Sequence, residues 1–274
     1  MDYKMFFALF GGLALFIFSM NFMSDGLQKA AGEKMRSILE VLTGNPVMGV
    51  LAGLLVTALI QSSSATTVIV IGLISAELMT LPQAISVIFG ANIGTTITAQ
   101  LVAFKISDYA WLFVAIGFIM FFASRKKQVK YIGPVILAFG MLFVGLSTMG
   151  DSMVPLGESQ IFRDWMTSVV DIPVLGVLVG TGMTLVLQSS SATIAILQQL
   201  ASTTTESGET MISLQQSLPI LFGDNIGTTI TAILASIGGG ITAKRVAAAH
   251  STFNIVGTVI FMFFVPWFAK AVML

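Results

Sequence analysis

The sequence predicts an all-helical integral membrane protein of two inverted-topology repeats, each with three transmembrane helices, a re-entrant helical hairpin and an interfacial amphipathic helix. Two observations predict this fold class. Hydrophobic residues form 55% of the 274 residues, charged residues form 9% and the mean hydropathy is +0.94, far outside the range of soluble domains. The hexapeptide Gln-Ser-Ser-Ser-Ala-Thr occurs at residues 61–66 and again at 188–193, and each copy interrupts an apolar run. A duplicated polar segment in apolar surroundings indicates two related halves.

Composition also argues against several classes of protein. The net charge is zero and the charges lie in short stretches, which argues against a nucleic-acid partner. The absence of cysteine excludes disulfides and thiolate catalysis. The apolar stretch at residues 5–23 is longer than the hydrophobic region of a signal peptide and has no small-residue cleavage site. We therefore expect it to be a retained membrane span.

We place the first repeat at residues 1–124. In residues 28–43, apolar side chains fall on one helical face and charged side chains on the other, which indicates an amphipathic helix in the membrane interface. The predicted spans are residues 5–23, 81–104 and 109–123. The polar segment at residues 90–96 is expected to interrupt the second of these spans.

A re-entrant hairpin is predicted at about residues 46–79. Its apolar arms, residues 46–60 and 65–79, are each about 15 residues long, whereas a helix needs about 20 residues to cross a bilayer. The polar side chains between the arms are costly in hydrocarbon unless they face protein or a wet cavity. We therefore expect both arms to enter and leave on the same side of the membrane, with the polar residues at the tip.

The second repeat is placed at residues 131–274, after a basic cytoplasmic linker at residues 125–130. Its hairpin, at about residues 173–201, matches the first at an offset of 127 residues, and the segment 223–229 matches residues 90–96 at an offset of 133. The predicted spans are residues 132–149, 214–237 and 249–268, and the second of them is again expected to be broken at its polar segment. An interfacial helix is predicted from the apolar face formed by Phe162, Trp165, Met166 and Val169.

Basic residues set the predicted orientation. Each half crosses the membrane an odd number of times, so the second half inserts upside down relative to the first. With residues 125–130 in the cytoplasm, nine of the 13 Lys and Arg residues lie inside, as the positive-inside rule requires. We therefore expect a multi-pass protein of a prokaryotic plasma membrane with both termini outside.

The two serine segments are candidates for anion binding. At each hairpin tip the serines would precede the returning helix, where free backbone N–H groups and the positive end of the helix dipole favour an anion. Hydroxyls add further donors, and no basic residue lies in the predicted core. Two such tips that meet from opposite sides would surround a small oxyanion. The predicted anion-binding residues are Ser62, Ser63, Ser64, Ser189, Ser190 and Ser191.

An anion that crosses an apolar membrane needs mobile cations to balance its charge. Amide and hydroxyl oxygens are hard ligands that suit sodium. Asp224 is the only carboxylate deep in a predicted span, where the first half has Ala91, and an intramembrane carboxylate is a functional candidate. The predicted sodium-binding residues are Gln61, Gln188, Asn92, Asn225, Thr95, Thr96, Thr228, Thr229 and Asp224.

At these residues the sequence resembles the type II sodium/phosphate cotransporter family. The marks of that family are two Gln-Ser-Ser-Ser hairpins in inverted repeats and two Gly-X-Asn-Ile-Gly-Thr-Thr segments, here at residues 90–96 and 223–229. The resemblance extends from about residue 5 to residue 268. It implies that the anion is inorganic phosphate and that sodium drives its uptake. The expected partners are therefore phosphate, sodium and the lipid bilayer, with no covalent cofactor, and the protein is expected to be a monomer or a homodimer.

The expected function is sodium-coupled symport of phosphate by alternating access, in which two inverted halves open a central site to either side in turn. A passive anion channel, or an exporter with different coupling, is the first alternative and differs in its dependence on a sodium gradient. An intramembrane serine hydrolase is a remote alternative, because His250, the only histidine, could serve just one of two equivalent serine segments as a base. The expectation is thus a transporter and not an enzyme. Serine and threonine can also simply join membrane helices, which is the structural alternative for these residues.

Overall fold

The structure is a computed structural model that describes residues 3–31, 45–103, 107–123, 127–158, 172–204, 208 and 210–272. The regular secondary structure of these residues is helical, apart from one isolated β-bridge between Thr204 and Thr210. The predicted interfacial helix of the second repeat lies outside the described residues. So does that of the first repeat, except for residues 28–31, which continue the first helix.

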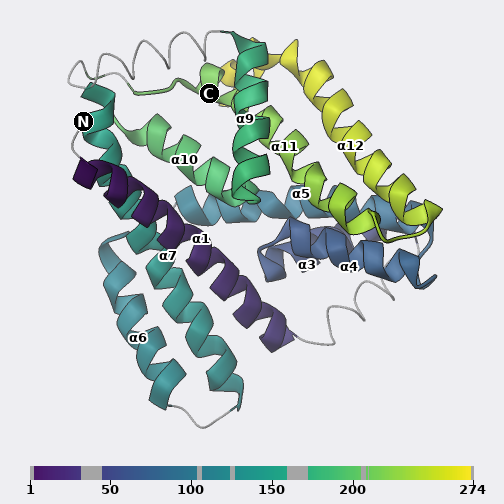
Figure 1. Ribbon diagram of the computed structural model, residues 1–274, viewed down its shortest axis with the longest axis horizontal. Coiled ribbons are helices and arrows are strands. Elements are labelled where there is room, and N and C mark those ends of the chain that lie inside the picture. Colours follow the sequence, from purple (N-terminus) through teal and green to yellow (C-terminus); the bar gives the residue numbers. More distant parts are fainter. Residues whose placement is uncertain are drawn as a thin grey trace. The chain divides into compact units, whose positions relative to one another are not determined.

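The helices, in chain order, are α1 (Tyr3–Ala31), α3 (Pro46–Ile60), α4 (Ser63–Ser75), α5 (Leu81–Ala103), the short 3-10 helix η1 (Ser107–Tyr109), α6 (Ala110–Ala123), α7 (Lys127–Glu158), α9 (Pro173–Leu187), α10 (Ser190–Ser202), α11 (Leu214–Ser236), α12 (Ile241–Met262) and α13 (Val265–Val272) (Figure 1). Among the described residues, α1, α5, α7 and α11 are long and apolar enough to cross a membrane. The bent pair of α12 and α13 adds a fifth candidate if it counts as one span. The protein is therefore a multi-pass helical membrane protein.

Two helix pairs have the same bounds at an offset of 127 residues. The first helix pair is α3 and α4, the second is α9 and α10, and a two-residue turn joins the helices of each pair. Asn45 begins α3, because its side chain accepts a hydrogen bond from the Met48 N–H at 2.9 Å and Pro46 follows in the first turn. The predicted hairpin arms are thus present as helices, while their re-entrant course and inverted orientation stay predictions.

α5 and α11 are continuous helices, so the predicted interruptions at residues 90–96 and 223–229 are wrong. The threonines in these segments satisfy their hydroxyls on the backbone of their own helix. Thr95 donates to the carbonyl oxygen four residues earlier at 3.1 Å, and Thr228 donates to the one three residues earlier at 2.7 Å. These polar side chains therefore need no break in the helix.

Glycines let α3 and α5 pack closely. A Cβ atom on Gly53 of α3 would overlap the carbonyl group of Val87 in α5, and a Cβ atom on Gly90 of α5 would overlap a carbonyl group of α3. The same pattern recurs between α9 and α11. Small residues at such crossings are typical of helix packing in membranes, so these glycines hold each helix pair against the long helix that follows it.

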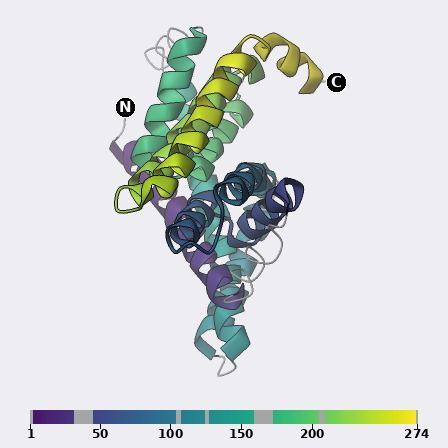
Figure 2. The ribbon, with the colours of Figure 1, turned by 90° about the vertical axis from the view of Figure 1, so that its right-hand side faces the viewer.

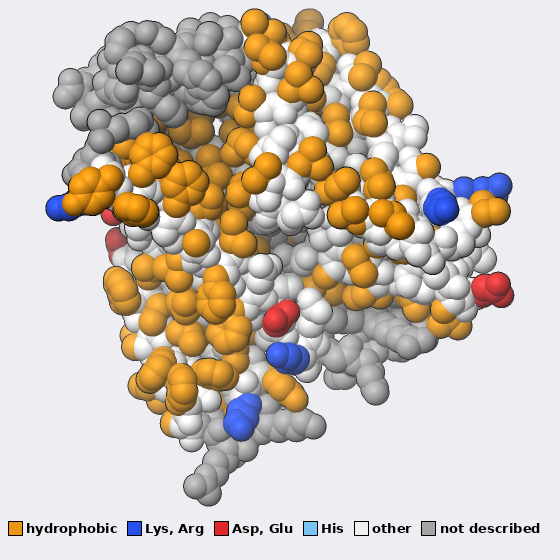
Figure 3. Space-filling model, viewed as in Figure 1, with side chains coloured by type: hydrophobic (Ala, Val, Ile, Leu, Met, Phe, Trp, Pro, Cys, Tyr) orange, Lys and Arg blue, Asp and Glu red, His pale blue; other side chains and the backbone are white. Residues whose placement is uncertain are grey.

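α6 and α7 form an antiparallel pair of neighbours (Figure 1). Gly117 of α6 and Gly133 of α7 lie against the backbone of the facing helix. α6 has 14 residues, fewer than the roughly 20 needed to cross a bilayer. Its outer surface is apolar, with Trp111 69% and Phe122 68% exposed, and hydrophobic side chains cover this part of the molecule in Figure 3. Such a surface fits contact with lipid. α7 extends beyond the predicted span of residues 132–149 at both ends.

The predicted span at residues 249–268 is wrong in its bounds. α12 begins at Ile241, and the chain bends by 81° between α12 and α13, as Figure 2 shows at the C-terminal end. Pro266, the second residue of α13, explains the bend. Proline has no backbone N–H, and its ring clashes with the carbonyl four residues earlier, at Met262, where α12 ends.

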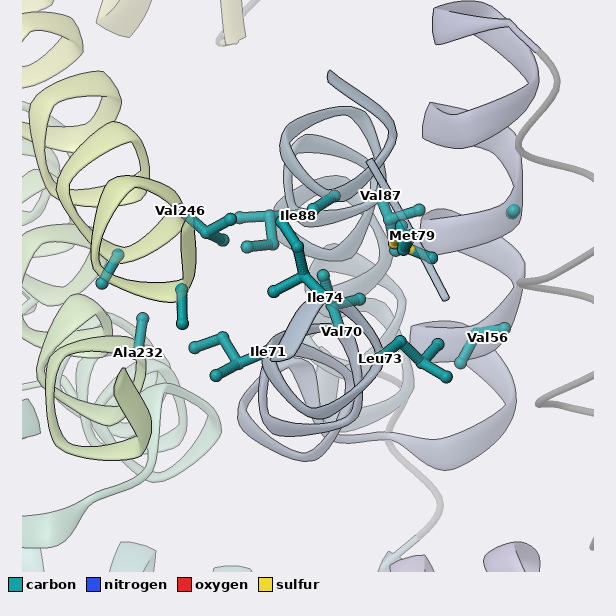
Figure 4. Packing of buried hydrophobic residues seen from close by; sticks show 14 of the residues in the cluster. Val56, Val70, Ile71, Leu73, Ile74, Met79, Val87, Ile88, Ala232 and Val246 are labelled. Atoms are coloured by element: carbon teal, nitrogen blue, oxygen red, sulfur yellow. The ribbon is translucent and has the colours of Figure 1, made fainter. Parts of the chain in front are cut away.

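The chain gathers into two compact units, each with segments from both predicted repeats. The first-pair unit, which contains α3 and α4, comprises residues 14–145 and 231–250, and the second-pair unit, which contains α9 and α10, comprises residues 1–13, 146–230 and 251–274. In the first-pair unit a buried aliphatic cluster joins α3, α4 and α5 to Ala232 of α11 and Val246 of α12 (Figure 4). In the second-pair unit α10 buries Ala195 and Leu197.

Candidate functional site

The first turn lies between α3 and α4. Gln61 ends α3 in the left-handed conformation, with φ at 59°. Ser62 then caps α4, because its hydroxyl oxygen accepts a hydrogen bond from the Ala65 N–H at 3.1 Å. Ser63 and Ser64 open α4, and N–H groups at this position have no partner within a helix. The turn thus presents hydroxyls and N–H groups at the positive end of a helix dipole.

The second turn, between α9 and α10, repeats this geometry. Gln188 is left-handed, with φ at 53°, and the hydroxyl of Ser189 accepts a hydrogen bond from the Ala192 N–H at 3.2 Å. Ser190 and Ser191 open α10. The two identical sequence segments therefore have the same backbone conformation and the same cap.

The six predicted serines differ in what their hydroxyls do. Ser62 and Ser189 use theirs as helix caps. The Ser64 hydroxyl lies 3.4 Å from that of Thr231 in α11, within the first-pair unit. The hydroxyls of Ser63 and Ser190 form no hydrogen bond within the described part of the chain. Ser63 and Ser190 are therefore the serines most available to donate to a ligand.

A threonine pair lies beneath each turn. The hydroxyls of Thr57 and Thr66 are 2.9 Å apart in the first helix pair, and those of Thr184 and Thr193 are 3.0 Å apart in the second. All four side chains are buried. Sequence reasoning did not place these residues in the site, although their common spacing of nine residues and their offset of 127 residues are visible in the sequence.

Two of the predicted sodium ligands have partners on other helices of the first-pair unit. Gln61 is 7% exposed, and its Oε1 atom accepts a hydrogen bond from the Thr98 hydroxyl at 3.0 Å. This bond joins the first turn to α5. The Asn92 Oδ1 atom lies 3.3 Å from Nε2 of His250 in α12. The first turn therefore has a support from α5 in Thr98, which sequence reasoning did not assign to the site.

The corresponding amides of the second-pair unit are exposed. The Gln188 side chain donates to the Leu185 carbonyl oxygen at 2.8 Å, as a local contact within the turn. Asn225 lies on an exposed part of α11. The two units thus share the backbone of the turn but differ in the surroundings of the amides.

The four predicted threonine ligands all bond within their own helices. Their hydroxyls donate to carbonyl oxygens of α5 or α11 that lie three or four residues earlier, and each oxygen keeps lone pairs with which it can accept a further bond or contact a cation. These residues are Thr95, Thr96, Thr228 and Thr229.

Asp224 lies in the middle of α11 and is fully buried. The Thr184 hydroxyl donates to its Oδ1 atom at 2.5 Å, which places the carboxyl group directly on the threonine pair beneath the second turn. Its Oδ2 atom is buried without a hydrogen-bond partner in the described structure. The first half has Ala91 at this position, so the carboxyl group is specific to the second-pair unit.

The two turn glutamines are expected to respond differently to glycine. Gln188→Gly should keep or slightly raise the melting temperature, because glycine adopts the left-handed conformation without the cost of about 1 kcal/mol that other residues incur. Gln61→Gly also removes the acceptor of the Thr98 hydroxyl, which costs about 1 to 3 kcal/mol when the group is buried. Thermal unfolding in detergent tests this. A Gln61→Gly protein as stable as Gln188→Gly would contradict the support from α5.

The helices and the two matching turns define a membrane protein with duplicated anion-binding motifs, the class to which transporters of small anions belong. The sequence profile described as Na+/Pi-cotransporter matches residues 15–151 and 155–272. The chain belongs to this family.

Individual relatives agree with this assignment. The chain is 33% identical over 245 residues to the uncharacterized protein YqeW of Bacillus subtilis, which covers 89% of this chain and 78% of YqeW. It is 28% identical over 262 residues to YjbB of Escherichia coli, named as a candidate inorganic phosphate export protein; the match covers 96% of this chain and 47% of YjbB. The human sodium-dependent phosphate transport protein 2B is 40% identical over 97 residues, or 35% of this chain and 14% of that protein. No solved structure matches the chain.

Proposed function

We propose that this protein transports inorganic phosphate together with sodium across a bacterial plasma membrane, as a symporter that works by alternating access. The observation that carries the proposal is the pair of matching turns, each with a left-handed glutamine, a serine cap and further serines at a helix N-terminus. Such a turn suits a tetrahedral oxyanion, because its donors are preorganised and the helix dipole favours negative charge. The name of the family supports phosphate as that anion.

Phosphate is proposed to bind the serines of both turns, which enter the membrane from opposite sides in two inverted repeats. Serine hydroxyls and backbone N–H groups supply donors without any basic side chain. Within the described helix pairs no Lys or Arg is present. The charge of the anion must therefore be balanced by mobile cations.

Sodium is the proposed counter-charge. Amide and hydroxyl oxygens near the turns suit this ion, and the names of the family and of the human relative support its role. Gln61 is the best placed candidate, since it belongs to the first turn and is held by Thr98. Gln188, Asn92, Asn225 and the four threonines of α5 and α11 remain proposed ligands.

Sodium removal tests the proposal. Proteoliposomes that contain the full chain are expected to accumulate labelled phosphate when an inward sodium gradient is applied, because each tenfold gradient supplies about 1.4 kcal/mol per coupled ion. Choline in place of sodium, or an ionophore that dissipates the gradient, should reduce the signal to that of protein-free vesicles. Equal uptake in sodium and choline would contradict sodium coupling while leaving phosphate transport intact.

Sodium-independent export is the second candidate, and the similarity to YjbB over 96% of this chain favours it. This chain spans 47% of YjbB, so the activity of that whole protein is not transferred. Vesicles preloaded with labelled phosphate distinguish the two functions. A symporter releases phosphate faster when sodium is present inside, whereas an exporter of the second kind releases it at the same rate in choline.

A further inference from the structure

The carboxyl group of Asp224 lies in a site built from three helices of the second-pair unit. Asp224 belongs to α11, Thr184 to α9 and Thr193 to α10. The Oγ1 atom of Thr184 is at 2.5 Å from Oδ1 of Asp224, at 3.0 Å from Oγ1 of Thr193 and at 3.0 Å from the carbonyl oxygen of Gly180. All three side chains are buried. Thr184 is therefore the centre of this hydrogen-bond network.

The number of hydrogens around Thr184 decides the charge of Asp224. A hydroxyl has one hydrogen to donate, but an ionised Asp224 and the Gly180 carbonyl are both pure acceptors. One of the two would then lack a hydrogen from Thr184. If Asp224 carries a proton on Oδ1, it donates to Thr184, and Thr184 donates to Gly180. One added proton therefore satisfies both contacts.

The second carboxyl oxygen leads to the same conclusion. Oδ2 of Asp224 is buried and has no hydrogen-bond partner within the described residues. An unpaired oxygen of a neutral acid has a modest cost in an apolar site, whereas an unpaired ionised carboxylate costs far more. The site therefore favours the neutral acid.

No opposite charge is at hand to stabilise the ionised form. α9 and α10 contain no ionisable residue. α7 packs on α10 at Gly150, and its Asp151 is exposed. α12 packs on α11 through Thr258 and Phe222, and its ionisable residues, Lys244, Arg245 and His250, precede the part of α12 that belongs to this unit. The two exposed basic residues of the terminal helices in this unit are Lys4 and Lys270.

We propose that Asp224 is a proton-binding site inside the membrane-spanning part of the second-pair unit, with Thr184 and Thr193 as its hydrogen-bonding partners. The first-pair unit has the same threonine pair, Thr57 and Thr66, without a carboxyl group, because Ala91 occupies the position of Asp224. The proton site is thus asymmetric between the repeats. Its link to transport rests on the proposed function, whereas proton binding itself does not.

Infrared spectroscopy of the purified full chain in lipid tests proton binding without transport. At neutral pH exposed Asp and Glu residues are ionised, so the wild-type protein is expected to show one protonated-carboxyl C=O band, which disappears as the pH is raised. Asp224→Asn should lack this band and remain folded, because its amide can donate to Thr184. Asp151→Asn is the control and should keep the band. A wild-type protein without the band at neutral pH, or a band that persists in Asp224→Asn, would overturn the proposal.

Phosphate uptake at several pH values tests the link to transport. Phosphate itself titrates, so the Asp224→Asn rate is divided by the wild-type rate at each pH. This ratio is expected to change with pH, by up to about tenfold per pH unit where Asp224 titrates. A purely structural role would give a constant ratio and would overturn the link. If the infrared band is present and the wild type moves no phosphate, the proposed function fails while the proton site stands.

Discussion

Gly180→Ala is expected to lower the melting temperature of the purified protein by roughly 5 to 10 °C, since overpacking a tight contact costs about 1 to 3 kcal/mol. A Cβ atom at Gly180 of α9 would overlap the carbonyl group of Ile220 in α11 and would lie 3.0 Å from the Asp224 backbone nitrogen. Backbone atoms cannot escape by changing a rotamer, so α9 and α11 must move apart. That movement also separates Thr184 from Asp224, and phosphate transport should fall with stability.

The matched control is Gly182→Ala, two residues further along α9. Nothing lies within 4 Å of a Cβ atom at Gly182, so alanine should be neutral or should stabilise the helix by about 0.5 to 1 kcal/mol. Gly53→Ala, at the equivalent position of the first helix pair, is expected to behave like Gly180→Ala. Equal melting temperatures for the Gly180 and Gly182 variants would show that the close approach of α9 and α11 does not stabilise the protein.

The helix pairs could be predicted because their signals are local. Asn45 and Pro46 mark the start of α3, and the Gln-Ser pair at residues 61 and 62 marks the turn, since glutamine leaves the helix and serine caps the next one. Repetition of the segment at residues 188–193 then predicts the second pair at the same offset. The hydrogen bonds that define each turn lie within a few residues of one another.

The interruptions of α5 and α11 were predicted wrongly because the decisive contacts are not local. Glycine, asparagine and threonine in one segment are typical of a broken membrane helix. In the structure Gly90 and Gly223 provide room for the facing helix, and the threonine hydroxyls return to their own backbone. Which of these roles a glycine has depends on the helix that crosses it. The bend after α12, in contrast, had a local signal in Pro266 that sequence reasoning did not use.

The site could be predicted in its residue types but not in its hydrogen bonds. The serines at both turns follow from the repeated segment. That Ser62 and Ser189 serve as caps, while Ser63 and Ser190 have free hydroxyls, depends on where each helix begins. The contact between Thr184 and Asp224 joins residues 40 positions apart and depends on the crossing of α9 and α11.

The double variant Ser63→Ala with Ser190→Ala is expected to give the largest loss of phosphate affinity. Each serine opens a helix and has a hydroxyl without a partner in the described structure, so its removal takes a donor from the ligand and leaves the cap in place. A lost hydrogen bond to a charged group costs about 1.5 to 3 kcal/mol, which is roughly tenfold to a hundredfold in affinity for each serine. The KM for phosphate should rise accordingly, and the melting temperature should stay near that of the wild type.

Ser75→Ala with Ser202→Ala is the matched control for this double variant. These two serines lie at the far ends of α4 and α10, again 127 residues apart, and their hydroxyls bond only to carbonyl oxygens of their own helices. Their removal takes the same atoms from the same two helices, so it should leave the KM unchanged. Ser62→Ala should instead lower the melting temperature, because the loss of an N-cap costs about 1 kcal/mol. A wild-type KM in the Ser63 and Ser190 double variant would place the phosphate site away from the turns, since no other change in these helices spares the caps and removes both free hydroxyls.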